Sequence, residues 1–187
     1  AVMSGLDLLD DPSAQDMRDD ALGLIRQSAA KMVALVHFAR VAFGAATTSE
    51  RFSGEELRNV LAGLTDGGRA TLDWRVGEET FTKIQARALL NLAYLTVSAL
   101  PMGGEAIVAV RSEDGQLILV GSAEGARARL KAEALTGLRG ERLTEGLAGQ
   151  WIQPYWLWLT VCDAGGRLQT TVEDGRVALI ARLPSAG

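Results

Sequence analysis

Residues 13–44 decide the architecture of the N-terminal part of the chain, and their sequence is SAQDMRDDALGLIRQSAAKMVALVHFARVAFG. The apolar positions in this stretch step alternately by three and four residues: Leu22, Ile25, Ala29, Met32, Val36, Ala39 and Phe43. Heptad spacing of this kind is typical of a helix that packs along its length against other helices. We therefore predict one long helix over residues 13–43, with Ser13 as N-cap, Asp16 in a capping box and Gly44 at its end.

A second, shorter helix is predicted over residues 1–9, and residues 10–12 (DDP) form the turn between the two helices. Together they make an antiparallel helical hairpin, which we assign to residues 1–48. Two helices alone bury too little apolar surface, so a homodimer with a four-helix bundle is expected. The chain starts at Ala1 inside an apolar pattern, and we expect the first helix to continue upstream.

Residues 49–187 form a second domain in which predicted helices and strands are interleaved. Asp114-Gly115 lies between two alternating apolar runs, which is a strong signal for a β-hairpin. Ser53 and Glu56 are spaced as a helical capping box. Helices are predicted over residues 54–64, 82–100, 131–138 and 152–164, and strands over 71–76, 105–111, 116–121, 167–172 and 176–183. The predicted fold class is α+β: a helical hairpin (dimeric four-helix bundle) followed by an α/β sandwich.

The composition limits the classes of function. Lys and Arg number 19 and Asp and Glu 23, a formal net charge of −4 that argues against nucleic acid as a partner. One cysteine and one histidine exclude an internal disulfide and a multi-histidine metal site, so no metal or cofactor is expected. No apolar run reaches the roughly 20 residues that a membrane-spanning helix needs. We expect a cytoplasmic protein that binds no membrane.

The order of these elements and several short strings resemble the core of sensor histidine kinases, a dimerising helical hairpin followed by an ATP-binding domain. The strings are LLNL at 89–92, PMGGE at 101–105, GLAG at 146–149 and DAGGRL at 163–168. The magnesium-binding Asn of that family falls on Leu95, which cannot coordinate Mg²⁺ because the ion needs oxygen ligands. The stretch 121–126 (GSAEGA) lacks the Asp that recognises adenine in that family. We therefore expect no ATP binding.

Aromatic residues follow the second glycine-rich string, at Trp151, Tyr155, Trp156 and Trp158. They lie where a nucleotide-binding member of the family would bind phosphate. Bulky rings at these positions predict that the former nucleotide pocket is filled.

A kinase scaffold without ATP binding resembles the ChpT-type histidine phosphotransferases of alphaproteobacteria. This likeness is carried by SGLDLL at 4–9, DMRDDA at 16–21, FARVAFG at 38–44, ARARL at 126–130 and ERLTEGLAG at 141–149. The resemblance implies a homodimer that takes a phosphoryl group from the receiver domain of a hybrid kinase (CckA) and passes it to response regulators (CtrA and CpdR). It also implies a phosphotransfer protein without ATP-dependent kinase activity of its own.

The resemblance places the phosphoacceptor histidine in a Cys-His-Asp motif on the first helix, about two helical turns before Ala1. His37 is the alternative acceptor, although it is expected to be an ordinary, partly exposed histidine at the edge of the bundle. The residues expected to dock receiver domains are Met3, Arg26, Gln27, Ala30, Lys31, Arg127 and Arg129. Cys162 lies in an apolar helix and is expected in the core.

Two other functions are compatible with the sequence. The first is a non-catalytic dimeric scaffold that uses the same surfaces only for interaction. The second is a fragment of an ATP-dependent sensor histidine kinase, against which Leu95 and the missing Asp argue. ATP binding would indicate the kinase, and a failure to label any histidine would indicate the scaffold.

Overall fold

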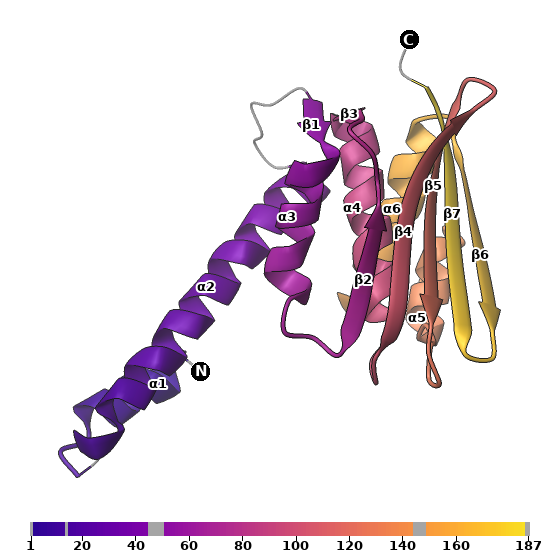
Figure 1. Cartoon of the computed structure of the whole chain (residues 1–187). Helices are drawn as coiled ribbons and strands as arrows, with labels where there is room; N and C mark the ends of the chain where they lie inside the picture. The colour runs from indigo at the N-terminus through magenta and orange to yellow at the C-terminus, as the bar shows by residue number, and fades with distance from the viewer. Residues whose placement is uncertain (1, 14, 45–50, 144–148, 186–187) are drawn as a thin grey trace.

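The computed structural model describes residues 2–13, 15–44, 51–143 and 149–185. A helical arm projects from one side of an α/β sandwich (Figure 1). The arm consists of α1 (Val2–Asp10), a short 3₁₀ turn η1 (Gln15–Met17) and α2 (Arg18–Ala42). The proposed domain boundary between residues 48 and 49, and most of the 146–149 glycine string, lie outside the described residues.

The sandwich has one five-stranded mixed sheet and a separate two-stranded ribbon. The ribbon pairs β1 (Arg51–Ser53) with β3 (Thr80–Thr82). The large sheet has the order β2-β4-β5-β7-β6, and only the β2–β4 pair is parallel. Its strands are β2 (Ala70–Arg75), β4 (Gly104–Glu113), β5 (Gln116–Glu124), β6 (Arg167–Glu173) and β7 (Arg176–Pro184).

Helices cover one face of this sheet (Figure 1). They are α3 (Gly54–Thr65), α4 (Lys83–Ser98), α5 (Ala132–Leu138) and α6 (Gly149–Asp163). The core lies between these helices and the inward residues of the strands, with α4 at its centre because nearly all of its apolar residues are buried. No helix in the described ranges is long and apolar enough to cross a membrane.

Local sequence signals explain where several elements begin and turn. Ser53 and Glu56 form the predicted capping box, with Glu56 N–H donating to Ser53 Oγ at 3.1 Å and Ser53 N–H donating to Glu56 Oε2 at 2.7 Å. Asp114 and Gly115 have φ values of 49° and 72°, as a two-residue hairpin turn requires. The predicted α+β fold class is confirmed, and each predicted element is found with its ends shifted by a few residues.

The predicted start of the long helix is wrong. The helix begins at Arg18 after η1, and its N-cap Met17 makes no side-chain capping bond. Ser13 instead donates from both its N–H and its hydroxyl to Asp11 Oδ1, at 2.8 and 2.6 Å. These bonds lower the pKa of Asp11. Ser13 therefore stabilises the turn between the helices rather than the first turn of α2. Short polar side chains such as that of serine form local hydrogen bonds of this kind in place of helical ones.

Candidate functional site

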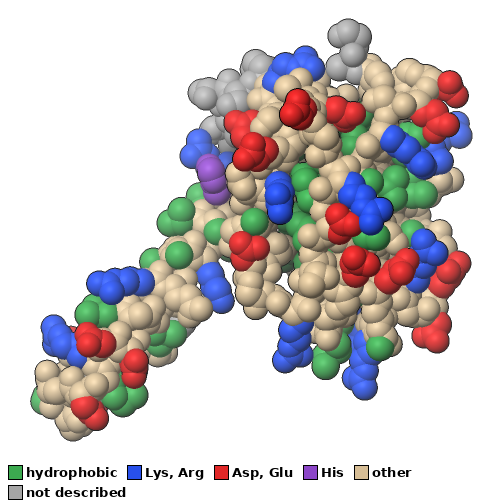
Figure 2. Space-filling model, viewed as in Figure 1, with side chains coloured by type: hydrophobic (Ala, Val, Ile, Leu, Met, Phe, Trp, Pro, Cys, Tyr) green, Lys and Arg blue, Asp and Glu red, His purple; other side chains and the backbone are tan. Residues whose placement is uncertain are grey.

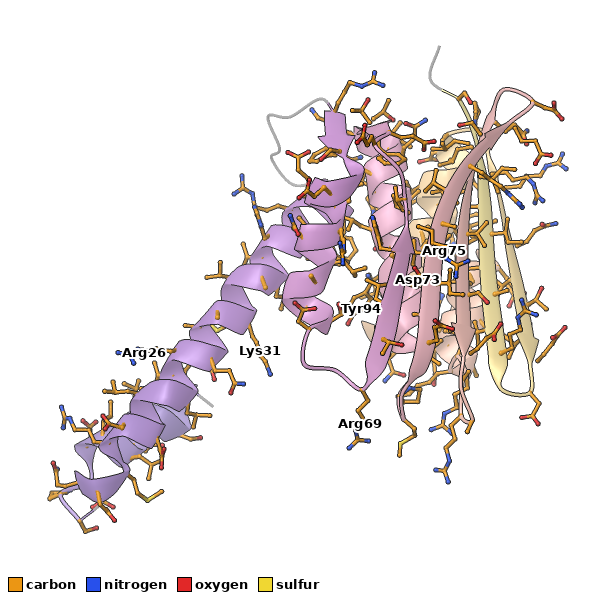
Figure 3. The ribbon with its side chains drawn as sticks, in the orientation of Figure 1. Arg26, Lys31, Arg69, Asp73, Arg75 and Tyr94 are labelled. Atoms are coloured by element: carbon orange, nitrogen blue, oxygen red, sulfur yellow. The ribbon has the colours of Figure 1, made fainter. Side chains whose placement is uncertain are left out.

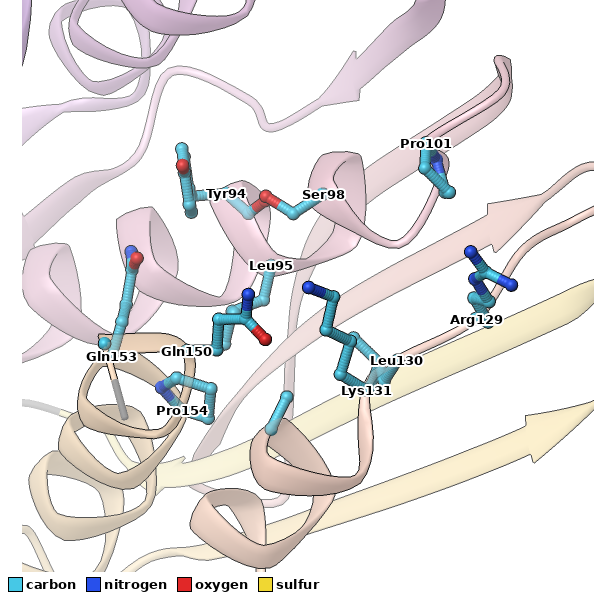
Figure 4. A pocket seen from close by; sticks show the side chains of 12 residues that line it. Tyr94, Leu95, Ser98, Pro101, Arg129, Leu130, Lys131, Gln150, Gln153 and Pro154 are labelled. Atoms are coloured by element: carbon cyan, nitrogen blue, oxygen red, sulfur yellow. The ribbon is translucent and has the colours of Figure 1, made fainter. Parts of the chain in front are cut away.

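A cavity of about 320 Å³ lies between α4, the loop that leads into α5, and the start of α6 (Figure 4). Its apolar wall includes Leu95, Leu130 and Pro154. Its polar lining comes from Ser98, Gln150, Gln153, Arg129 and Lys131. The cavity occupies the place at which the kinase resemblance predicts a nucleotide.

The cavity offers poor ligands for Mg²⁺. Leu95 lines it from α4 and is 6% exposed, so the position expected to hold the magnesium ligand presents a hydrocarbon chain. No carboxylate is among the described residues that line it. The Ser98 hydroxyl donates to Tyr94 O at 2.7 Å, and the Gln153 amide donates to Asn91 Oδ1 at 3.1 Å. Because Mg²⁺ binds through oxygen ligands, usually carboxylates, this lining does not suit the ion.

The prediction that aromatic rings fill the cavity is wrong. Trp151 stacks on Tyr155 with ring centroids 4.3 Å apart, and Tyr155 contacts Trp158 at 5.5 Å. These rings lie on the side of α6 that packs against α5, where Gly137 lies close to the backbone of Trp151 and Tyr155 and Gly140 lies against the ring of Trp158. Residues three and four apart share a helix face, so the aromatic residues lie together on one side of α6. The cavity is lined by the other side of α6, which carries none of these rings.

Two cations flank the cavity. Arg129 N–H donates to Ala99 O at 2.9 Å, which fixes the loop against the end of α4. Arg129 and Lys131 are both exposed, and among the described residues their side chains have no hydrogen-bond or ion-pair partner. Arg127 is exposed on the same loop. This loop therefore presents a positive surface beside the cavity, close to the end of α4.

The predicted docking residues of the arm are all exposed, but they do not share one face. Met3 lies on α1, and Arg26, Gln27, Ala30 and Lys31 lie on α2. Arg26 and Lys31 are about 140° apart around the helix axis at 3.6 residues per turn. Lys31 points to the side of the arm that faces the sandwich, and Arg26 points to the opposite side (Figure 3). Of these two cations, only Lys31 is therefore on the side of the arm that faces the sandwich (Figure 3).

The two reactive side chains singled out in the sequence are both exposed. His37 lies on α2 near the sandwich, and its imidazole is accessible (Figure 2). The prediction that Cys162 is a core residue is wrong, because its side chain is exposed in the last turn of α6. Partial burial, and to a smaller extent Asp163, raise the pKa of the Cys162 thiol.

Sequence reasoning missed Asn91, a fully buried amide on α4 that bonds to both α2 and α6. The available signal was its position, a single polar residue inside the apolar run 88–95. Buried polar groups in such runs are nearly always hydrogen-bonded.

Comparison with known proteins identifies the family. A model described as the histidine phosphotransferase C-terminal domain matches residues 54–176, well over half of the chain. The chain belongs to the histidine phosphotransferase family. It is 28% identical over 177 residues to the protein phosphotransferase ChpT of Brucella abortus (strain 2308), which covers 93% of this chain and 83% of that protein.

One solved structure supports the same assignment, and a second shows the fold. A bacterial phosphotransferase determined at 1.7 Å superposes with a TM-score of 0.83 and 25% identity, over 97% of this chain and 86% of that one. The histidine kinase domain of the Erythrobacter litoralis blue-light activated histidine kinase EL346 superposes with a TM-score of 0.54 and 10% identity, over 98% and 92%. The second likeness shows that this histidine phosphotransferase has the fold of a histidine kinase core.

Proposed function

We propose that this histidine phosphotransferase relays a phosphoryl group from the receiver domain of a CckA-like hybrid kinase to CtrA-like and CpdR-like response regulators. It does so in the cytoplasm as a homodimer, with residues 1–48 as the helical bundle and residues 49–187 as a domain that no longer uses ATP. The observation that carries the proposal is a phosphotransferase domain whose cavity has Leu95 in place of a magnesium ligand.

The phosphoryl group passes between one histidine of this protein and one aspartate of each partner. A lone pair on one imidazole nitrogen attacks the phosphorus of the donor aspartyl phosphate, so an N–P bond forms while the P–O bond to the carboxylate breaks. The donor carboxylate leaves with the electron pair. The reverse step then transfers the group from the histidine to the acceptor aspartate. The protein's own contribution is therefore the histidine nucleophile and the positioning of the two partners, without a nucleotide.

We place the acceptor histidine on the first helix upstream of Ala1, with His37 as the alternative. His37 is exposed, but it lies next to the buried Phe38 and close to the point where α2 enters the sandwich. A receiver that approached His37 would have to fit beside the sandwich. The upstream position is preferred because the resemblance places the acceptor there, in a Cys-His-Asp motif on the first helix.

The experiment that tests the relay follows label from a phosphorylated receiver domain. We expect a chain extended upstream through the first helix to take up acid-labile label, and the 187-residue chain to take up none. Label on the shorter chain, lost in His37→Ala, would make His37 the acceptor. Label on neither chain would contradict the relay and favour the scaffold. In parallel, binding of Mg-ATP measured by titration calorimetry would favour the kinase.

The proposed docking surface consists of exposed residues of the arm and of the sandwich, and it can be tested by reversing one positive charge on each. We expect Lys31→Glu and Arg129→Glu each to slow transfer by about tenfold at low salt, because charges at the rim of an interface act mainly on the association rate. The loss should shrink at high ionic strength, where screening weakens both charges. Arg167→Glu on the edge strand β6 is the matched control. A slowdown of the same size with Arg167→Glu would show a general charge effect instead of docking.

A further inference from the structure

The end of α2 is bonded to two helices of the sandwich through a single carbonyl group. The Ala42 carbonyl accepts a hydrogen bond from Asn91 Nδ2 on α4 at 2.9 Å and another from Trp156 Nε1 on α6 at 3.0 Å. The last carbonyls of a helix have no partner within the helix and are often left to water. Here side chains from two other helices replace that water, and Ala42 is fully buried.

Asn91 is the centre of this junction. Besides Ala42, its Nδ2 donates to Arg87 O at 2.8 Å, and its Oδ1 accepts from Gln153 Nε2 at 3.1 Å. Both amide hydrogens and the amide oxygen are therefore in use, in a side chain that is 0% exposed. One residue of α4 thus links α2 to α6, and any rotation of the arm would leave buried polar groups without partners. Such unpaired groups are costly in the interior.

Apolar contacts restrain the same turn of α2. Phe38 packs against Tyr94 with ring centroids 5.3 Å apart, and Phe43 packs against Trp156 at 6.2 Å. Phe38 and Val41 are buried in the same core cluster as α4. The C-terminal part of α2 is therefore packed into the sandwich: its last turns belong to the core, and Ala34 lies beside Gly63 of α3, while the part of α2 before Ala34 projects away (Figure 1).

We propose that Asn91 is a positioning residue: through Ala42 and Gln153 it fixes the angle at which the arm leaves the sandwich. This holds the docking side chains of the arm and the sandwich, represented by Lys31 and Arg129, at one separation for an incoming receiver. The inference rests on the proposed relay function. A protein that receives its phosphoryl group from a partner does not need to move its sandwich toward its own histidine, so a rigid junction is compatible with the transfer step.

The angle is measured directly by electron paramagnetic resonance between two spin labels. Cys162 on α6 is the sole cysteine in the sequence and is exposed, and Gly23→Cys supplies the second site on α2, where an added side chain meets nothing within 4 Å. Labelling is carried out at mildly alkaline pH because the pKa of Cys162 is raised. Mixing with excess unlabelled protein removes distances between molecules. We expect one narrow distance distribution.

Asn91→Leu keeps the number and branching of the side-chain heavy atoms and removes all three hydrogen bonds of Asn91. We expect the distance distribution to become at least about twofold wider, and receiver-to-histidine transfer in the upstream-extended chain to slow by about tenfold. Trp156→Phe removes one donor to Ala42, keeps a ring against Phe43, and should give an intermediate width. It also tests the junction if Asn91→Leu does not fold.

Val177→Ala is the matched control, because Val177 is 1% exposed on β7 and belongs to a separate core cluster. It should lower the melting temperature and leave the distance distribution narrow. An unchanged width in both junction variants would overturn the proposal, as would a wide distribution with an unchanged transfer rate. If the upstream-extended chain without substitutions accepts no label, the relay itself fails, and the width measured without substitution at the junction still reports separately whether the junction is rigid.

Discussion

Gly121→Val in the centre of β5 is expected to lower the free energy of unfolding by about 3 kcal/mol. Helix α4 lies directly on the strand at this point. A Cβ atom added at Gly121 would overlap Thr96 Oγ1 and come within 2.9 Å of Leu92 Cδ2. Thr96 cannot turn aside without loss, because its hydroxyl donates to Leu92 O at 2.8 Å and the side chain is 1% exposed. The helix must therefore move away from the sheet.

Thermal or urea unfolding measures this loss. A change of about 3 kcal/mol corresponds to a fall in melting temperature of roughly 6–12 °C for a protein of this size. Gly23→Ala is the control, since Gly23 is exposed on α2 with no atom within 4 Å of an added Cβ. It should be neutral or stabilising by up to about 1 kcal/mol, because alanine is the better helix former. A Gly121→Val protein that melts with the wild type would mean that α4 can shift at little cost.

Met32→Glu combined with Val36→Glu is expected to convert the proposed dimer to monomer. These residues are 58% and 59% exposed in the single chain, and they continue the stripe of α2 whose beginning, at Ala21 and Ile25, is covered by Gly5 of α1. Figure 2 shows hydrophobic side chains along this arm. An apolar stripe of this length in water favours a bundle partner, and two buried carboxylates would each lose their hydration.

Light scattering coupled to size-exclusion chromatography gives the mass of each form. We expect self-association to weaken by more than about a hundredfold, which corresponds to about 2.7 kcal/mol. Gln27→Glu with Ala30→Glu adds the same charge on the opposite face of α2 and should leave the dimer intact. Equal dissociation in both double variants would indicate simple charge repulsion. A dimer that persists in Met32→Glu/Val36→Glu would place the interface elsewhere.

The structural features that were predicted correctly are those that depend on residues close to one another in the sequence. The Ser53–Glu56 capping box and the Asp114-Gly115 turn are short-range arrangements, and both are present as expected. The β1–β3 ribbon was not predicted, because Phe52 pairs with Phe81 and nothing local marks so distant a partner. Two strands of only three residues also carry too few side chains to show an alternating pattern.

The errors at the candidate site have the same origin. The rings of Trp151 and Tyr155 were expected to fill the cavity, but their helix face depends on how α6 rotates against α5. Cys162 was expected in the core because its neighbours are apolar, but it lies on the exposed side of α6, while the adjacent Val161 takes the buried side. The role of Asn91 at the junction could not be seen in the LLNL string, because its partners Ala42 and Gln153 are 49 and 62 residues away.

Because α2 is long, a small rotation at its junction with the sandwich produces a large displacement at its other end. At about 1.5 Å per residue its 25 residues span roughly 37 Å, and its contacts with the sandwich lie in its C-terminal part, from Ala34 beside Gly63 of α3 to Ala42. A rotation of about 10° at that end would move the far end by roughly 6 Å, about one helical turn. Reacting atoms in a transfer must come within about 3–3.5 Å of each other. The contacts at this end of α2 therefore limit how far the rest of the arm can move, and small losses of order there would be amplified toward its tip.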